Sequence, residues 1–184
     1  MTETADIVVI GGGIIGSSVA YQLAKLLDIS TRIVVCDRGP IAGATSASCM
    51  GHLMVTPDTA QDYALTKTSV DMWGDLAEEL GGFDYNPTGA LYLAETDEDL
   101  EMMPVLKKQF ADNGDRADVL DLKQLRDIEP GLAADIPGAL FYAGDGVVLP
   151  MLAAGAMLRG AQAINPNVVV RPNCAVKGFE RDGN

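Results

Sequence analysis

Three glycines near the start of the chain have the spacing of a turn that binds phosphate. Gly11, Gly13 and Gly16 come directly after a short apolar run, Ile7–Ile10, and Asp37 comes 21 residues after the last of them. In a G-x-G-x-x-G turn the first glycine permits a tight bend, the second lets backbone N–H groups approach a pyrophosphate, and the third lets a helix pack closely on a strand. A carboxylate at position 37 can accept hydrogen bonds from adenosine ribose hydroxyls and would repel a 2′-phosphate. The pattern therefore predicts a site for FAD or NAD rather than for NADP.

Such a site requires the neighbouring residues to form a β-α-β unit. Ile7–Ile10 is expected to be a parallel strand buried on both faces, because it is a continuous apolar run. Apolar residues recur at helical spacing from Ile15 to Leu27, so a helix should pack one face on the sheet and direct its positive end at the phosphate. Ile33–Cys36 is expected to be a second buried strand. The alternative is a glycine-rich turn followed by a solvated acid, which leaves the coincidence of strand, turn, helix and acid unexplained.

The remaining sequence predicts further elements and a second lobe. We expect helices between Asp58 and Leu80, from Thr96, from Asp121 to about Pro130, and from Pro150 to Ile164. We expect strands at Gly89–Ala94, Ala139–Ala143, Val168–Arg171 and Ala175–Glu180, and a hairpin turn at Asp182-Gly183. The predicted fold class is α/β, with a Rossmann-like dinucleotide-binding domain around a parallel sheet, formed by residues 1–84 and 141–184, and part of an α+β lobe, formed by residues 85–140.

The composition restricts the classes of partner. Of the 184 residues 48% are apolar and 21% charged, as in a packed globular protein, and the formal net charge of -13 argues against nucleic acid. No apolar run approaches the roughly 20 residues that cross a bilayer, and the first residues lack the basic region of a signal peptide. Cys36, Cys49 and Cys174 have no metal-binding spacing, so we interpret them as reduced thiols of a cytoplasmic protein without a metal site. Peripheral attachment to a membrane through a partner subunit is compatible with this sequence.

Segments beyond the β-α-β unit resemble the family of D-amino-acid oxidase, glycine oxidase and sarcosine oxidase. Four segments match in the family's order and extend the resemblance over nearly all of the chain: Gly43–Gly51, which resembles the second flavin-contact segment, Gly89–Leu93, Asp121–Leu132, and Gly138–Pro150, which resembles the D-G-x-x-x-P segment before a helix. The run from Ser46 to Trp73 is most similar to the flavoprotein subunits of opine oxidases and hydrogen cyanide synthase.

This resemblance implies an extended FAD, with its pyrophosphate over Gly11–Gly16 and its ribose on Asp37. The cofactor-binding residues it implies are Gly11, Gly13, Ile14, Ile15, Gly16, Asp37, Arg38, Thr45, Ser46, Ser48, Cys49, Gly51, His52 and Val176. The implied reaction transfers a hydride to flavin N5 from the carbon beside the nitrogen of an amino acid, an N-substituted amino acid of the opine or sarcosine type, or a related amine. Oxygen or a quinone would then accept the electrons. Because the flavin performs the electron chemistry, few catalytic side chains are required.

Some residues near these segments have more than one interpretation. His52 could be an ordinary loop residue, a polar residue beside the flavin ring, or a covalent flavin ligand, although its position does not match that of the family's covalent histidine. Cys49 is interpreted as a small buried residue rather than a reactive thiol, because no cationic neighbours are evident. Four apolar residues at helical spacing are expected to pack in the core: Met72, Trp73, Met102 and Met103.

The resemblance also implies residues that this sequence does not contain. In the family the substrate carboxylate is held by an arginine, with tyrosines nearby, in the later half of the chain, and a further glycine-rich segment closes over the flavin. We therefore expect a C-terminal fragment or a second subunit to complete the fold, in a hetero-oligomer, and to supply the catalytic residues. The alternative is an FAD-binding electron-transfer or scaffold subunit of a multi-subunit dehydrogenase, without a substrate site of its own.

Overall fold

The computed structural model describes residues 3–181, which divide into two compact units. Among the described residues, the first unit comprises 3–51, Leu76–Asp84 and 148–181, and the second comprises His52–Asp75 and Tyr85–Val147. The assignment of residues 1–84 and 141–184 to FAD binding, and of 85–140 to a substrate lobe, stays a prediction.

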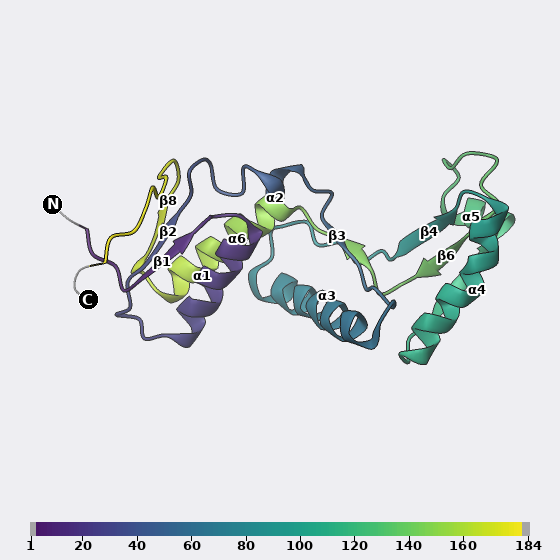
Figure 1. Ribbon diagram of the computed structural model, residues 1–184, viewed down its shortest axis with the longest axis horizontal. Helices are drawn as coiled ribbons and strands as arrows, with labels where there is room; N and C mark the ends of the chain where they lie inside the picture. The colour runs from purple at the N-terminus through teal and green to yellow at the C-terminus, as the bar shows by residue number, and fades with distance from the viewer. Residues whose placement is uncertain (1–2, 182–184) are drawn as a thin grey trace. The chain divides into compact units, whose positions relative to one another are not determined.

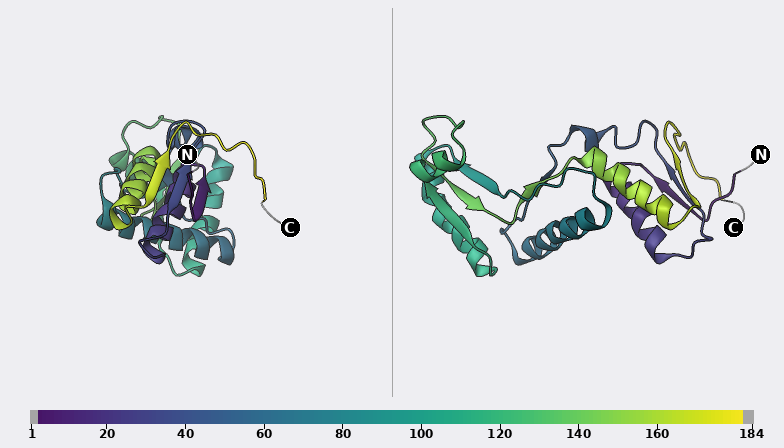
Figure 2. Two further views of the ribbon diagram at one scale, coloured as in Figure 1. Left: turned by 90° about the vertical axis from the view of Figure 1, so that its left-hand side faces the viewer. Right: turned by 180° about the vertical axis from the view of Figure 1, so that it is seen from behind.

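The first unit contains the parallel sheet that the sequence predicts. Strands β1 (Ile7–Ile10), β2 (Ile33–Cys36) and β8 (Val168–Arg171) pair in the order β1-β2-β8, and both pairs are parallel. Helices α1 (Ile14–Leu26) and α6 (Pro150–Ile164) lie against each other on the same face of this sheet (Figures 1 and 2). The apolar cluster between sheet and helices contains Val9, Ala20, Val35, Leu158 and Val170. This arrangement confirms the β-α-β unit and the mixed α/β fold. The expected packing face of α1 is wrong, because Ile15, Val19 and Leu26 are 77%, 43% and 78% exposed and the helix packs through small residues such as Ala20 instead.

The expectation that β1 is buried on both faces is wrong. Val8 and Ile10 are 52% and 54% exposed, whereas Val9 packs toward the helices. Side chains alternate between the two faces of a strand, and both helices cover the face of Val9. β1 is also an edge strand of the sheet that the described residues form, so it has a pairing partner on one side only.

The second unit is built around an antiparallel sheet. Its strands β4 (Ala90–Ala94), β6 (Gly138–Tyr142) and β5 (Ala117–Asp121) pair in the order β4-β6-β5. A two-stranded pair joins β3 (His52–Leu53) to β7 (Gly146–Val147). The helices of this part of the chain are α3 (Ala60–Leu80), whose residues from Leu76 onward belong to the first unit, α4 (Asp97–Asp112) and α5 (Leu122–Ile128).

The predicted helix starts are confirmed by their capping interactions. Thr96 and Asp99 form a reciprocal capping box at the start of α4, and Asp121 and Gln124 form another at the start of α5. Pro150 is the first residue of α6, where its missing N–H costs nothing. These signals are local in the sequence, which explains why they predict the structure well.

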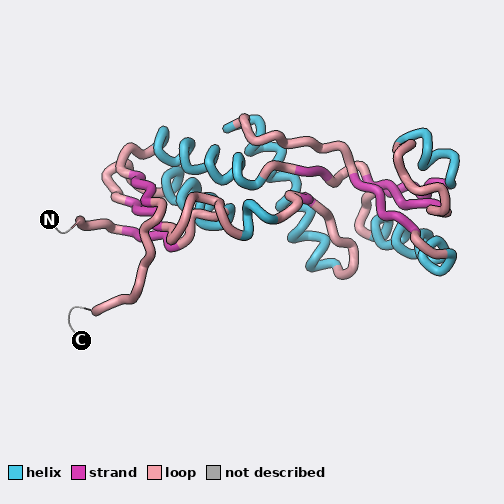
Figure 3. The backbone as a smooth tube through the Cα atoms, turned by 90° about the horizontal axis from the view of Figure 1, so that it is seen from above, coloured by secondary structure: helices cyan, strands magenta, loops and turns pink. Residues whose placement is uncertain are grey.

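Some predictions that depend on tertiary packing are wrong. Met103 is buried, but Met72 and Met102 are exposed. Residues 175–180 form no strand and follow β8 as an exposed loop segment (Figure 3), because a strand needs a hydrogen-bonded partner. The hairpin turn predicted at Asp182-Gly183 lies outside the described residues.

None of the helices among the described residues combines the length and the apolarity that crossing a membrane requires.

Candidate dinucleotide-binding site

The turn between β1 and α1 has the geometry that the glycine spacing predicts. Gly11 has a φ of 104°, a conformation that L side chains rarely adopt, and its N–H donates to the carbonyl oxygen of Cys36 at 2.7 Å. A Cβ atom on Gly16 would lie 1.8 Å from the carbonyl oxygen of Gly11. Only glycine fits at position 16 without a shift of the backbone, so the first turn of α1 lies directly against the turn that follows β1.

The N-terminus of α1 is suited to an anion. Gly13 is the N-cap residue and has no side chain to occupy the first N–H groups, and the first turn contains no acid. The first N–H groups of a helix have no partner within the helix, and the helix dipole adds positive potential there. One of them, that of Ile14, donates to the Ser46 hydroxyl at 3.0 Å. A helix end whose N-cap residue has no side chain, together with a close backbone turn, fits a pyrophosphate group.

Asp37 is placed beside this turn by two backbone hydrogen bonds. Its carboxylate accepts the N–H of Gly12 and the N–H of Gly39, each at 2.8 Å. These bonds, that from Gly39 first, lower the pKa of Asp37 below its ordinary value, so the group is anionic at neutral pH. Each carboxylate oxygen has a second lone pair, so Asp37 can still accept hydrogen bonds from ribose hydroxyls.

The small-residue segment after β2 meets the same turn. Helix α2 (Thr45–Ser48) places the buried Ser46 side chain against the N-terminus of α1. A Cβ atom on Gly13 would lie 3.1 Å from the Ser46 hydroxyl oxygen, so the two segments are in close contact. The amide of Ala42 also donates to the carbonyl oxygen of Gly12 at 3.0 Å. Among the residues expected near the phosphates, Ser46 is thus the one fixed against the glycine turn.

The other expected cofactor residues occupy varied positions. Thr45, Ser48, Arg38 and Ile15 are exposed. Cys49 is exposed as well, so the expectation that it is buried is wrong. Their contacts with a cofactor stay predictions.

Gly51, His52 and Val176 lie further along the chain. Gly51 has a φ of 72°, and a Cβ atom there would lie 1.9 Å from the carbonyl oxygen of Val148. His52 is exposed, belongs to the second unit, and pairs with Val147 in the short β3-β7 ladder. Val176 is 38% exposed and lies outside every helix and strand. The cofactor roles of all three residues stay predictions.

Sequence reasoning missed two residues of the glycine turn. Gly12 holds the Asp37 carboxylate through its N–H, and the buried Ser17 directs its hydroxyl to the carbonyl oxygen of Gly12. Gly12 is one of the variable positions of the motif, so the pattern gives it no role. Ser17 carries a signal that could have been used, because a polar side chain on the buried face of a helix needs a partner.

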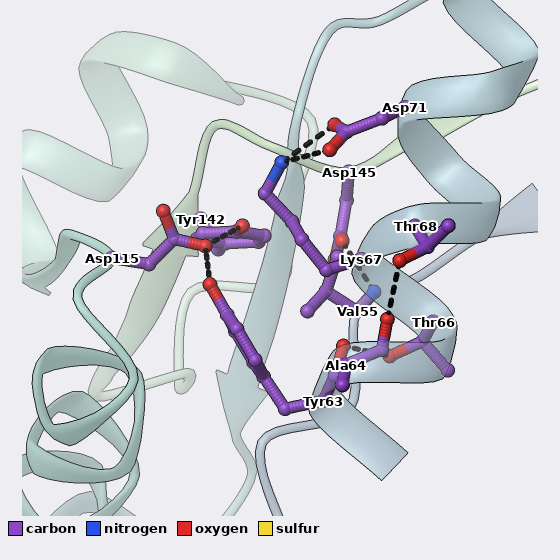
Figure 4. Close-up of polar contacts among 10 residues, drawn as sticks. All are labelled: Val55, Tyr63, Ala64, Thr66, Lys67, Thr68, Asp71, Asp115, Tyr142 and Asp145. Carbon is purple, nitrogen blue, oxygen red and sulfur yellow. Dashed lines mark hydrogen bonds and ion pairs between the residues drawn. The ribbon is translucent and has the colours of Figure 1, made fainter. Parts of the chain in front are cut away.

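The second unit contains a buried polar network that the sequence analysis also missed. Asp145 is 1% exposed, and its carboxylate accepts the N–H of Val55 at 2.8 Å and the hydroxyl of Tyr92 at 2.9 Å. Burial raises the pKa of Asp145, and these hydrogen bonds oppose that rise. Close by, Asp115 accepts hydrogen bonds from the hydroxyls of Tyr63 and Tyr142 (Figure 4).

The described residues contain no cluster of three or more histidine, cysteine, aspartate or glutamate side chains that could hold a metal ion.

The fold and the glycine turn define a dinucleotide-binding protein of the Rossmann type. Residues 6–184 match the family model DAO, which describes FAD dependent oxidoreductases. The chain therefore belongs to the FAD-dependent oxidoreductase family.

Curated relatives and solved structures agree with this family. The chain is 28% identical to the hydrogen cyanide synthase subunit HcnC of Pseudomonas aeruginosa, over all of the chain and 53% of that protein. It is 28% identical to the sarcosine oxidase subunit beta of Arthrobacter sp, over 98% of the chain and 46% of that protein. The crystal structure of glycine oxidase from Bacillus cereus ATCC 14579 superposes with a TM-score of 0.81 at 26% identity, covering 92% of the chain and 46% of that protein. The chain thus spans about half the length of these relatives.

Proposed function

We propose that this chain holds the ADP half of FAD in an enzyme that oxidises a C–N bond of an amino acid, an N-substituted amino acid or a related amine. The observation that carries the proposal is the joint placement of the Gly11–Gly16 turn, the N-terminus of α1 and the Asp37 carboxylate. The family match supports FAD as the ligand of this site. The related glycine oxidase and sarcosine oxidase subunit support the class of substrate.

In the proposed complex, each group of the site has a defined task. The N–H groups at the start of α1 bind the pyrophosphate, and Asp37 accepts the ribose hydroxyls. When bound, FAD would supply a hydride acceptor, its N5 atom, for oxidation of the carbon beside the substrate nitrogen. This chain binds FAD and orients it. The substrate-binding residues belong to another part of the proposed enzyme.

We further propose that a C-terminal portion or a second subunit completes the enzyme. The similar HcnC and sarcosine oxidase subunit beta are named as subunits, and the chain spans about half the length of each. Purification of the native protein under mild conditions, followed by gel and intact-mass analysis, tests this proposal. A yellow complex with a second polypeptide, or a longer single polypeptide, supports it. A colourless and stable 184-residue monomer contradicts it.

The substrate class is tested on that purified complex under anaerobic conditions. Amino acids, N-methyl amines and opines are added one at a time, and the loss of flavin absorbance at about 450 nm is followed. Bleaching by one of these compounds supports oxidation of a C–N bond. If FAD is present but none of them bleaches it, the chain serves an electron-transfer or scaffold role instead.

Replacing Asp37 by alanine should weaken FAD binding by roughly 10- to 100-fold, because hydrogen bonds to a charged group contribute about 1.5–3 kcal/mol. Fluorescence titration with FAD measures the change, and circular dichroism confirms that the variant is folded. Asp28→Ala is the matched control. Asp28 also accepts a local backbone N–H, from Ser30, but it precedes β2, whereas Asp37 follows that strand. Equal FAD affinity in the two variants would show that Asp37 does not contribute to FAD binding.

A further inference from the structure

The segment that follows β8 lies beside the end of β2. Cys36, the last residue of β2, pairs across the sheet with Arg171, and the amide of Asp37 donates to the carbonyl oxygen of Arg171 at 3.0 Å. Two residues further along, Asn173 has a φ of 56° and its amide donates to the carbonyl oxygen of Gly39 at 3.0 Å. The amide of Cys174 then donates to the carbonyl oxygen of Asp37 at 2.7 Å. Cys174 is therefore held next to the residue that follows Cys36.

The Cys36 side chain points away from the helices of this unit. Val35 packs toward α1 and α6, and the alternation of side chains along a strand places Cys36 on the opposite face. Arg171 is in register with Cys36 and shares this face, where the Glu3 carboxylate pairs with it at 2.8 Å. Burial raises the pKa of the Cys36 thiol, and the neighbouring thiol of Cys174 raises it further, whereas Arg171 lowers it. The two cysteines are 138 residues apart in sequence, but the Cys174 backbone is bonded to Asp37 and its thiol interacts with that of Cys36.

We propose that Cys36 and Cys174 form a reversible intramolecular disulfide when the protein meets a peroxide. The bond joins the strand that ends at Asp37 to the segment after β8, and so fixes the backbone beside the proposed ribose site. The hydrogen bond from Cys174 to Asp37 already holds Cys174 beside the residue that follows Cys36 in the reduced state, and a disulfide requires the two Cα atoms to lie within about 7 Å of each other.

The chemistry begins at Cys174, because this thiol is exposed and that of Cys36 is buried. The Cys174 thiol loses its proton, the thiolate attacks hydrogen peroxide, and the O–O bond breaks to give a sulfenic acid and hydroxide, which takes up the released proton and becomes water. The Cys36 thiol then attacks the sulfenic sulfur, an S–S bond replaces the S–O bond, and a second water leaves with the thiol proton. Two thiols lose two electrons in total, and one peroxide molecule is reduced to water.

Peptide mapping of the oxidised chain tests this proposal directly. The reduced chain is treated in dilute solution with hydrogen peroxide, alkylated, and digested with trypsin without a reducing agent. Cys36 is released in residues 33–38, Cys49 in residues 39–67 and Cys174 in residues 160–177, because trypsin does not cut before Pro172. We expect a cross-linked pair of the first and third peptides, which dithiothreitol separates. Cross-links that contain Cys49, cross-links between two chains, or Cys174 oxidised to sulfinic acid beside a reduced Cys36 would overturn the proposal.

Matched variants add a second readout. Oxidation should raise the melting temperature of the wild-type chain and of Cys49→Ser by roughly 5–10 °C, because the disulfide closes a long loop. Cys36→Ser and Cys174→Ser should show no rise. Cys49 is an exposed thiol outside the pair, so Cys49→Ser controls for the loss of one thiol. A rise in Cys36→Ser equal to that of the wild type contradicts the proposed bond, and neither readout depends on FAD or substrate.

Discussion

Replacement of Gly16 by alanine is expected to reduce FAD affinity at least about 100-fold and to lower the free energy of unfolding by roughly 2–4 kcal/mol. The added Cβ atom would lie 1.8 Å from the carbonyl oxygen of Gly11 and 3.4 Å from a side-chain carbon of Val9. The first contact involves backbone, which cannot move aside as a flexible side chain can. Helix α1 must therefore shift away from β1, and the N–H groups proposed to bind the pyrophosphate move with it. Titration with FAD and urea unfolding followed by circular dichroism measure the two effects.

The control for this substitution is Gly74→Ala in helix α3. A Cβ atom on Gly74 would meet the hydroxyl oxygen of Tyr85 at 3.7 Å, which is ordinary van der Waals contact. Alanine is favoured over glycine within a helix by about 1 kcal/mol, so this variant should be as stable as the wild type or more so. Its FAD affinity should be unchanged. If Gly16→Ala retained wild-type affinity, the turn after β1 would not be the phosphate site.

The parts of the fold that the sequence predicts are those determined by neighbouring residues. The strand, glycine turn and helix that begin at Ile7 depend on a periodic pattern and on a backbone conformation that glycine adopts, and both can be read directly. The same holds for the capping boxes at Thr96 and Asp121. The exposure of a side chain depends instead on whether another segment packs on that face of its strand or helix. An apolar side chain such as Val8 or Met72 has the same pattern whether or not another segment packs on it, so the sequence could not predict its exposure.

In the candidate site, too, local sequence patterns predict some contacts and long-range packing determines the others. The spacing of Gly11, Gly16 and Asp37 predicts their proximity, because a β-α-β unit brings both ends of the motif to the carboxyl edge of the sheet. Ser46 comes from a different segment, and no spacing rule predicts that its hydroxyl accepts the N–H of Ile14. The proximity of Cys36 and Cys174 depends on the pairing of β2 with β8, which is likewise a long-range contact.

Removal of the Asp145 carboxylate is expected to destabilise the second unit by roughly 2–4 kcal/mol, because a buried donor left without a partner costs about 1–3 kcal/mol. In Asp145→Ala the N–H of Val55 would lose its acceptor, and the hydroxyl of Tyr92 would keep only its longer hydrogen bond to the carbonyl oxygen of Val55, at 3.5 Å. The fluorescence of Trp73, the only tryptophan and a residue of this unit, reports its unfolding in urea. Asp135→Ala removes an exposed acid from the same unit and should change stability little. Equal stability of the two variants would show that the Asp145 network contributes nothing.

The same carboxyl group predicts a pH dependence whose sign follows from its raised pKa. The pKa of an unfolded aspartate is about 3.9, and the pKa of the folded Asp145 is higher because burial disfavours its charge. Between the two pKa values the folded chain holds a proton that the unfolded chain has lost. The contribution of this group to the free energy of unfolding is therefore complete below about pH 3.9 and falls as the pH rises through the folded pKa. Asp145→Asn cannot titrate and lacks this fall. Urea unfolding of both proteins between about pH 4 and pH 7 should therefore show the stability of the wild type, relative to Asp145→Asn, decreasing with pH. An increase would mean that the hydrogen bonds from Val55 and Tyr92 outweigh burial and hold the folded pKa below that of the unfolded chain.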